Sequence, residues 1–381
     1  MKKSKYNSVV IVLVVSLVVL LSYYFYDSRK EFSVKCINGE KKYECWRNSL
    51  LSTLNNRGLS ASYDLLADFY NTDPEFVSEC HGFTHEIGEQ AYSIYKSKKK
   101  IDLTPKTSYC GYGFYHGFME ALLQTDGNIK DAEGFCDYAD KQLLEFNKKT
   151  NIACYHGIGH GAVDGSGSVT WESPQEFIGE ALKICKVIAN SSDRIYQCGT
   201  GVFNSLAIVL NSSMFDLNFS GNPYDICLVQ ENDFKRACFE QMNTRITTLS
   251  NGDLSKGISY ILKIPEKEYS IVAMEQLAPA TIAQKVGKNS DFNSEISTCK
   301  SSVEYLRKPC IEGLAGGILE FGKPDSEYIE AMDLCESTGT VEYKDICYRY
   351  VLSSLKILYS QDKVSEVCKT VTKEYTKYCQ N

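Results

Sequence analysis

The sequence lacks an excess of positive charge. Its 41 lysines and arginines are outnumbered by 48 aspartates and glutamates, which gives a formal net charge of -7. Proteins that bind nucleic acid need basic patches that offset the charge of the phosphates. This chain has no basic stripe of that kind, so the sequence predicts no nucleic-acid partner.

Two spacing motifs are also missing. No Cys-x-x-Cys occurs among the 16 cysteines, which removes the sequence motif for zinc ribbons, thioredoxin-type redox pairs and c-type haem attachment. The zincin motif His-Glu-x-x-His is not met either, because the match that starts at His85 ends in Glu89. Few stretches alternate between apolar and polar residues as strands do. The sequence therefore predicts an all-α protein.

A long apolar run is present near the N-terminus, from Val9 to Tyr26. Its length is near the lower limit for crossing a bilayer of about 30 Å, and its last residues are aromatic, as is typical of a membrane interface. A signal peptide would have a shorter apolar core followed by small residues. We interpret residues 9–26 as an uncleaved transmembrane signal anchor, residues 1–8 as a cytoplasmic tail and residues 27–35 as a linker.

The cysteines indicate on which side of the membrane the rest of the chain lies. There are 16 of them, an even number, spread over the part that follows the anchor. Such a pattern is typical of a disulfide framework in an oxidising compartment. We expect residues 36–381 to form an extracytoplasmic domain of a single-pass membrane protein.

Most cysteines come in pairs, and the second member of each pair opens an apolar stretch that predicts a helix. The pairs are Cys36 with Cys45, Cys136 with Cys154, Cys185 with Cys198, Cys227 with Cys238, Cys299 with Cys310, Cys335 with Cys347, and Cys368 with Cys379. By elimination, Cys80 is predicted to pair with Cys110. Second cysteines recur every 40 to 44 residues from Cys110 to Cys238. This period is typical of an α-solenoid of helical hairpins, each pinned by a disulfide.

One repeat lacks both cysteines of its pair, which indicates that the paired cysteines form disulfides and are not metal ligands. The segment that starts at Ala273 matches the segment that starts at Cys238, with alanine in place of the cysteine. Leu262 stands eleven positions earlier, where the partner cysteine is expected. Both members are lost together, as expected if neither is useful without the other.

The cysteine motifs of the predicted hairpins resemble those of a known protein family. A Cys-x-x-Gly step enters the second helix at Cys110-Gly-Tyr-Gly and at Cys310-Ile-Glu-Gly. This arrangement resembles the disulfide-stapled branch of the tetratricopeptide superfamily. The resemblance covers most of residues 110–379 as architecture, and the Leu-Gly and Lys-Ala signatures of that branch are absent. It implies a concave surface that binds a protein or peptide outside the cytoplasm, and it carries over no functional residue.

All five histidines lie in the units that span residues 80–165, and residues 166–381 have none. They belong to three copies of one sequence motif, His-Gly-x-x-(His or Glu). The copies are His81 to His85, His116 to Glu120 and His156 to His160. On a helix, residues four apart lie on the same face. Each motif therefore presents two polar side chains on one face of its helix, and stacked hairpins bring equivalent positions together.

We predict that the five histidines bind a divalent transition metal, zinc or iron, since imidazole and carboxylate ligands suit these ions better than calcium. The predicted ligands are His81, His85, His116, His156 and His160. Glu86 and Glu120 are the predicted catalytic bases. The step from His85 to Glu86 also resembles the helical-repeat di-iron hydroxylases, which bind iron through His-Glu steps.

Two other interpretations are left open by the sequence. Duplication of one hairpin also copies the histidine motif without creating a metal site. In that case the histidines are structural, and the protein is a non-catalytic scaffold that docks a protein or peptide. A histidine cluster can also sense pH near 6 without any metal. The glycines around the histidines, such as Gly117 and Gly157, fit both tight helix packing and the approach of a ligand.

Overall fold

The computed structural model describes residues 36, 41–144, 151–164, 173–188, 191–212, 222–286 and 291–379. Every regular element in these ranges is a helix, which confirms the all-α prediction. The predicted cytoplasmic tail, anchor and linker, residues 1–35, lie outside the described residues. Within those residues, no helix combines the length and apolar character needed to cross a membrane.

The elements of the first half begin with a pair of helices that precede the histidines. They are α2 (Lys42–Arg57), α3 (Leu59–Thr72), α4 (Pro74–Lys98), η1 (Pro105–Ser108), α5 (Gly113–Asp126), α6 (Ile129–Leu144), α7 (Asn151–Asp164), α8 (Pro174–Ile188), α9 (Ser192–Asn211) and α10 (Asp225–Leu228). Local signals set several of their starts. Asp73 caps α4 by accepting a hydrogen bond from the backbone N–H of Glu75, and Pro74 occupies the first turn.

The second half continues with shorter hairpins. Its elements are α11 (Asn232–Gln241), α12 (Asn243–Ser250), α13 (Leu254–Ile261), α14 (Lys267–Ala283), α15 (Asn293–Ser301), α16 (Glu304–Phe321), α17 (Glu327–Ser337), α18 (Val341–Leu358), α19 (Gln361–Thr370) and η2 (Thr376–Cys379). Hydroxyl side chains cap two of these helices. Thr340 and Ser360 accept hydrogen bonds from backbone N–H groups in the first turns of α18 and α19.

Eight disulfides join the cysteines in the predicted pairs, including Cys80 with Cys110. Five of them connect a helix to the next one in a hairpin, namely α6 to α7, α8 to α9, α10 to α11, α15 to α16 and α17 to α18. The hairpin of α13 and α14 forms without a bridge, with Leu262 at the end of α13 and Ala273 inside α14. The repeat that lacks both cysteines is therefore the hairpin that forms without a disulfide.

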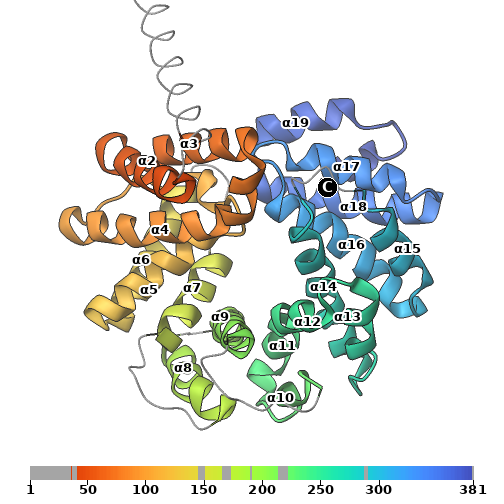
Figure 1. Cartoon of the computed structure of the whole chain (residues 1–381), viewed down its shortest axis with the longest axis horizontal. Helices are drawn as coiled ribbons and strands as arrows, with labels where there is room; N and C mark the ends of the chain where they lie inside the picture. Colours follow the sequence, from red (N-terminus) through yellow and green to blue (C-terminus); the bar gives the residue numbers. More distant parts are fainter. Residues whose placement is uncertain are drawn as a thin grey trace, which may run out of the picture.

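One helix of each hairpin packs on its counterpart in the next, in the order of the sequence. Contacts run from α4 to α5, α7, α9, α11, α14, α16 and α18. Figure 1 shows that this succession turns around a central opening, with helices such as α8, α13, α15 and α19 farther out. The described part of the chain is therefore a ring, and the core lies between its inner and outer helices.

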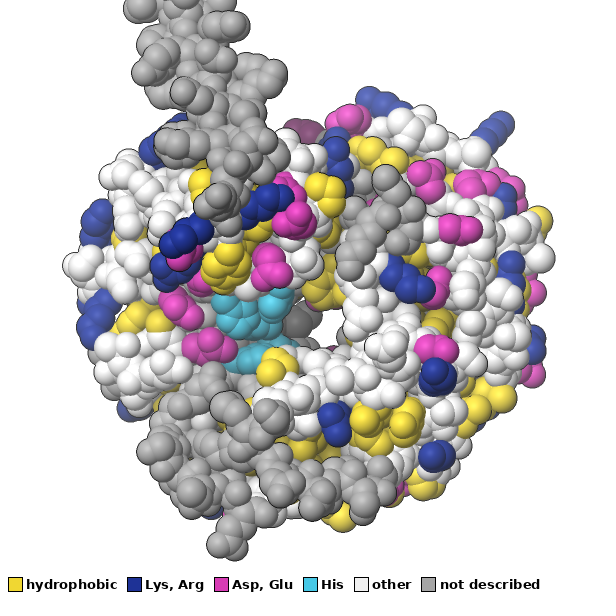
Figure 2. Space-filling view, in the orientation of Figure 1, with side chains coloured by type: hydrophobic (Ala, Val, Ile, Leu, Met, Phe, Trp, Pro, Cys, Tyr) yellow, Lys and Arg dark blue, Asp and Glu magenta, His cyan; other side chains and the backbone are white. Residues whose placement is uncertain are grey.

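The ring is closed by contacts between the two ends of the described chain. The hydroxyl of Tyr70, at the end of α3, donates a hydrogen bond of 2.5 Å to the backbone oxygen of Phe321, at the end of α16. The Phe321 ring also lies against Gly111, just before α5. The ring encloses a cavity of about 1250 Å³, and its opening is visible in the space-filling view (Figure 2).

Glycines allow the inner helices of the histidine units to approach closely. A Cβ atom added at Gly117 of α5 would lie 2.1 Å from the backbone oxygen of His85 on α4. One added at Gly201 of α9 would lie 1.9 Å from the backbone oxygen of His156 on α7. These distances are far inside van der Waals contact, so glycine is required there for helix packing.

We expect the Gly117→Ala variant to be less stable than the wild type by about 1–3 kcal/mol, because the new methyl group displaces the α4 backbone. The matched control is Gly134→Ala in α6, where an added Cβ has no atom within 4 Å. That change should stabilise the protein by up to about 1 kcal/mol through helix propensity. Thermal melts followed by circular dichroism measure both effects. Equal shifts in the two variants would contradict this account of Gly117.

Candidate metal centre

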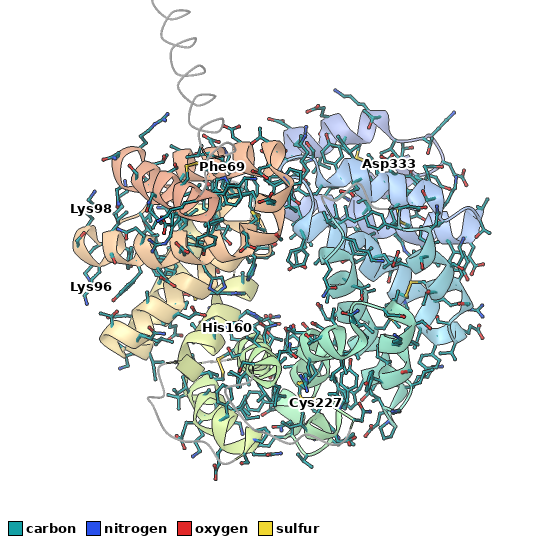
Figure 3. All side chains as sticks on the ribbon, in the orientation of Figure 1. Phe69, Lys96, Lys98, His160, Cys227 and Asp333 are labelled. Carbon is teal, nitrogen blue, oxygen red and sulfur yellow. A yellow bond between two sulfur atoms is a disulfide. The ribbon has the colours of Figure 1, made fainter. Side chains whose placement is uncertain are left out.

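Three adjacent inner helices supply the candidate metal ligands, two side chains each. Helix α4 packs on α5 and α5 packs on α7, so the three faces defined by the four-residue spacing meet. The meeting residues are His81, His85, His116, Glu120, His156 and His160. The five histidines among them are called the histidine cluster below. Figure 2 shows these histidines together at the rim of the central opening, and Figure 3 places His160 near the inner edge of the ring.

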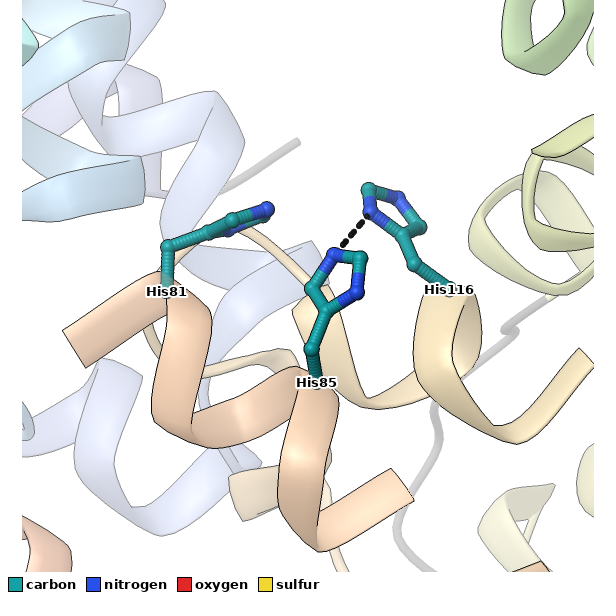
Figure 4. Close-up of side chains that lie close together, drawn as sticks. All are labelled: His81, His85 and His116. Atoms are coloured by element: carbon teal, nitrogen blue, oxygen red, sulfur yellow. Dashed lines mark hydrogen bonds between the residues drawn. The ribbon is translucent and has the colours of Figure 1, made fainter. Parts of the chain in front are cut away.

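His116 stands at the centre of the histidine cluster. The centroid of its ring is 4.4 Å from that of His160, 4.9 Å from those of His85 and His156, and 5.4 Å from that of His81. Figure 4 shows the rings of His81, His85 and His116 directed toward a common space. The predicted ligands are thus brought together in one place.

Two sets of three histidines lie close enough together to hold a metal ion. The first triad is His81, His85 and His116, and the second triad is His116, His156 and His160. Within each triad the candidate donor atoms lie within 4.8 Å of one another. His116 belongs to both triads.

A tight turn before α5 places the hydrogen-bond acceptor of His81. Three successive residues, Cys110, Gly111 and Tyr112, have φ angles of 54°, 74° and 60°. Only glycine adopts this left-handed conformation without cost, and strain of this kind is concentrated at functional sites. The turn directs the backbone oxygen of Cys110 toward His81, whose Nδ1–H donates a hydrogen bond of 2.7 Å to it.

Hydroxyl groups from α9 contact the two histidines of α7. The Nδ1 atom of His156 lies 2.8 Å from Thr200 Oγ1. The Nδ1 atom of His160 lies 2.9 Å from Ser205 Oγ. The Nε2 atom of His160 is buried and has no close hydrogen bond within the described residues, and Asn204 lies beside the ring.

Glu120 lies between the two triads. One carboxylate oxygen is 3.6 Å from Nδ1 of His85, and the other is 3.7 Å from Nδ1 of His160. The structure thus places Glu120 next to the histidines. Glu86, the other predicted base, points to α2 instead, where it contacts Arg47 and accepts a hydrogen bond from the hydroxyl of Tyr43.

Burial keeps four of the imidazoles neutral. It lowers the pKa of His81 to about 4 and that of His156 to about 3, and charges on neighbouring imidazoles act in the same direction. Burial and the same repulsion hold the pKa of His116 and of His160 well below the ordinary value, with Asn204 opposing this weakly at His160. At neutral pH these four rings therefore have lone pairs available for a metal.

We expect the metal-free protein to lose stability as the pH falls from about 6.5 toward 3, relative to a His156→Gln variant. The unfolded histidine binds a proton near pH 6.5 and the folded one only near pH 3, so acid favours the unfolded state. The relative loss is up to about 1.4 kcal/mol per pH unit in this window. Urea titrations of both proteins at several pH values measure it. Parallel curves would contradict the shift.

The sequence reasoning missed three carboxylates that share the central cavity with the histidines. Glu240, Glu320 and Glu327 line the same cavity as His81 and His116. Burial raises the pKa of each of the three to about 7, so they exchange protons near neutral pH. A signal for one of them is present in the repeat, because Glu320 follows Cys310 by ten residues, as Glu120 follows Cys110.

Comparison of the chain with protein-family models, with curated proteins and with solved structures gave no match.

Proposed function

We propose that this chain is a metal-dependent extracytoplasmic protein, whose histidine cluster binds a transition metal at the wall of the ring cavity. The observation that supports this most strongly is the convergence of five imidazoles, four of them held neutral by burial. The Nε2 atom of His160, which has no close hydrogen bond within the described residues, is available to such an ion.

The donor atoms of the cluster suit zinc and copper, and they also accommodate iron. A bound ion of this kind acts as a Lewis acid or activates water at neutral pH. His81, His116 and His156 line the cavity, so a substrate in the cavity reaches the metal from the open side. We assign Glu320 as the proton carrier for chemistry at that metal, since it lines the same cavity and ionises near pH 7. Glu86 remains a predicted base, although its contacts are with α2.

Two features of the chain support a proposal for its location. The eight disulfides indicate an oxidising compartment. We propose that residues 9–26 anchor the ring in the membrane and that residues 36–381 lie on the outer side. We also propose that the ring is an α-solenoid related in architecture to tetratricopeptide-type repeats, supported by the sequential packing of its inner helices.

Metal binding by the histidine cluster tests the proposal. Full-length protein is purified in detergent, stripped with a chelator and titrated with zinc, and the bound metal is counted after dialysis. We expect stoichiometric zinc and an increase of the melting temperature on binding. The His156→Ala/His160→Ala variant should bind less, and the Glu133→Gln variant, changed at a surface carboxylate of α6, should bind as the wild type does. A folded protein that retains no zinc and is not stabilised by it would refute the proposal.

A second candidate function is the capture of a peptide or other polar ligand without chemistry. It is favoured by the uncharged amides that line the same cavity, such as Gln197, Asn204, Gln241 and Gln276. Amides of this kind pair readily with peptide groups. Ligand binding that is unchanged by a chelator would support this function over the metal-dependent one.

A further inference from the structure

The hydrogen-bond partners of the histidines determine which ring nitrogen is available to a metal. A backbone carbonyl only accepts hydrogen bonds, so Nδ1 of His81 carries the proton that bonds to Cys110. Thr200 donates its single hydroxyl proton to the backbone oxygen of Gln197 at 2.6 Å. Its oxygen must therefore accept a proton from Nδ1 of His156. In both rings the proton is on Nδ1, and Nε2 has a free lone pair.

Glu120 lies beside one histidine of each triad and acts on its ring through charge. Its two oxygens face Nδ1 of His85 and Nδ1 of His160, at 3.6 and 3.7 Å. A carboxylate beside a ring nitrogen attracts the proton of that nitrogen, which leaves Nε2 for the metal. In His160, Nδ1 also lies 2.9 Å from Ser205 Oγ, and Nε2 is buried without a close hydrogen bond within the described residues. Four histidines thus direct Nδ1 toward oxygen and retain Nε2 as a donor.

His116 differs from the other four. Its Nδ1 atom lies 3.0 Å from Nε2 of His85, and none of its hydrogen bonds within the described residues is to an oxygen. Two nitrogen ligands of one tetrahedral ion, each about 2.0–2.1 Å from the metal, lie about 3.3 Å apart. The observed separation is close to this value, so an ion fits between the two rings after a small movement. The other nitrogen of His116 remains for the second triad.

We propose that the histidine cluster holds two metal ions joined by the ring of His116. The first ion is bound by Nε2 of His81, Nε2 of His85 and Nδ1 of His116, and the second by Nε2 of His116, His156 and His160. Glu120 binds neither ion and instead orients one histidine in each triad. This inference rests on the proposed function, and it replaces the predicted role of Glu120 as a base with a positioning role.

Binding of two ions to His116 removes the proton of its ring. A neutral imidazole has one ring proton, so binding both nitrogens of His116 to metal releases that proton to solvent and leaves an imidazolate. The negative imidazolate and the Glu120 carboxylate together offset part of the charge of two divalent ions. Each ion has three nitrogen ligands, and a fourth position is left for water or a substrate from the cavity.

Titration with copper(II) tests the bridge directly. Chelator-treated full-length protein should take up two ions per chain. The electron paramagnetic resonance signal of separate copper ions should grow to one equivalent and then fall as the second ion couples through the imidazolate. The Glu120→Gln variant should still bind two ions, with affinity weaker by about 10–100-fold, as for other changes behind metal ligands. The Glu133→Gln variant should match the wild type.

The possible results separate this inference from the proposed function. No bound copper or zinc refutes the proposed function and the bridge together. One ion per chain refutes the bridge and leaves the proposed function standing. Two ions whose resonance signals simply add also refute the bridge, because they show two independent sites. An unchanged affinity in Glu120→Gln refutes the positioning role of Glu120.

Discussion

Replacing His116 by alanine should abolish tight metal binding in both triads. Each proposed site has three nitrogen ligands, and His116 supplies one ligand to each of them. Loss of a direct ligand should weaken each site by at least about 100-fold, since changes behind the ligands already cost about 10–100-fold. Calorimetric titration with zinc at neutral pH measures the loss. The expected trace for His116→Ala has no binding step in the range where the wild type saturates.

The matched comparison is His81→Ala, which removes a ligand from the first triad only. We expect this variant to retain one tight zinc ion per chain. Circular dichroism establishes that both variants are folded, because deletion of a buried ring also leaves a cavity in the packing. Equal losses in the two variants would contradict the central position of His116. Retention of two tight ions by His116→Ala would contradict its role as a ligand.

Reduction of the disulfides is expected to unfold the ring. Each bridge contributes about 2–4 kcal/mol in the usual chain-entropy treatment, and a typical domain is stable by only about 5–15 kcal/mol. The described residues contain eight bridges and no free cysteine. Their combined loss therefore exceeds the stability of most domains. Far-ultraviolet circular dichroism during treatment with a reductant measures the loss of helix.

Removal of single bridges should show that their effects depend on position. The Cys185→Ser/Cys198→Ser variant lacks the disulfide of a hairpin inside the ring. The Cys368→Ser/Cys379→Ser variant lacks only the disulfide that holds the last element. In a repeat array each unit is stabilised by its neighbours, so a break in the middle weakens two interfaces. We expect a larger fall in melting temperature for the inner pair. A fully reduced protein that keeps its helix content and melting temperature would contradict this account.

The disulfide pairing was predictable from the sequence because the pairs are local. Separations of 9 to 18 residues place both cysteines of most pairs in one hairpin. The pair of Cys80 and Cys110 spans 30 residues and was identified only by elimination. The meeting of the histidines was likewise predictable, because equivalent positions of neighbouring hairpins face the same side.

The closure of the ring was not predictable. It depends on Tyr70 and Phe321, which are 251 positions apart, and no local pattern in either segment specifies the other. The same holds for Glu320, which reaches the histidine cavity only because the ring closes. The positioning role that we propose for Glu120 was not predictable either, since its relation to His85 and His160 depends on the packing of three helices. The predicted anchor of residues 9–26 lies outside the described residues and stays a prediction.

Anomalous X-ray scattering at the zinc edge, from crystals of the zinc-loaded protein, is the most direct test of metal binding by the histidine cluster. The account predicts two peaks, one on each side of the His116 ring, with His81 and His85 around the first and His156 and His160 around the second. A single peak would remove the bridge and keep the metal site. The absence of any peak within bonding distance of the histidine nitrogens would contradict the account.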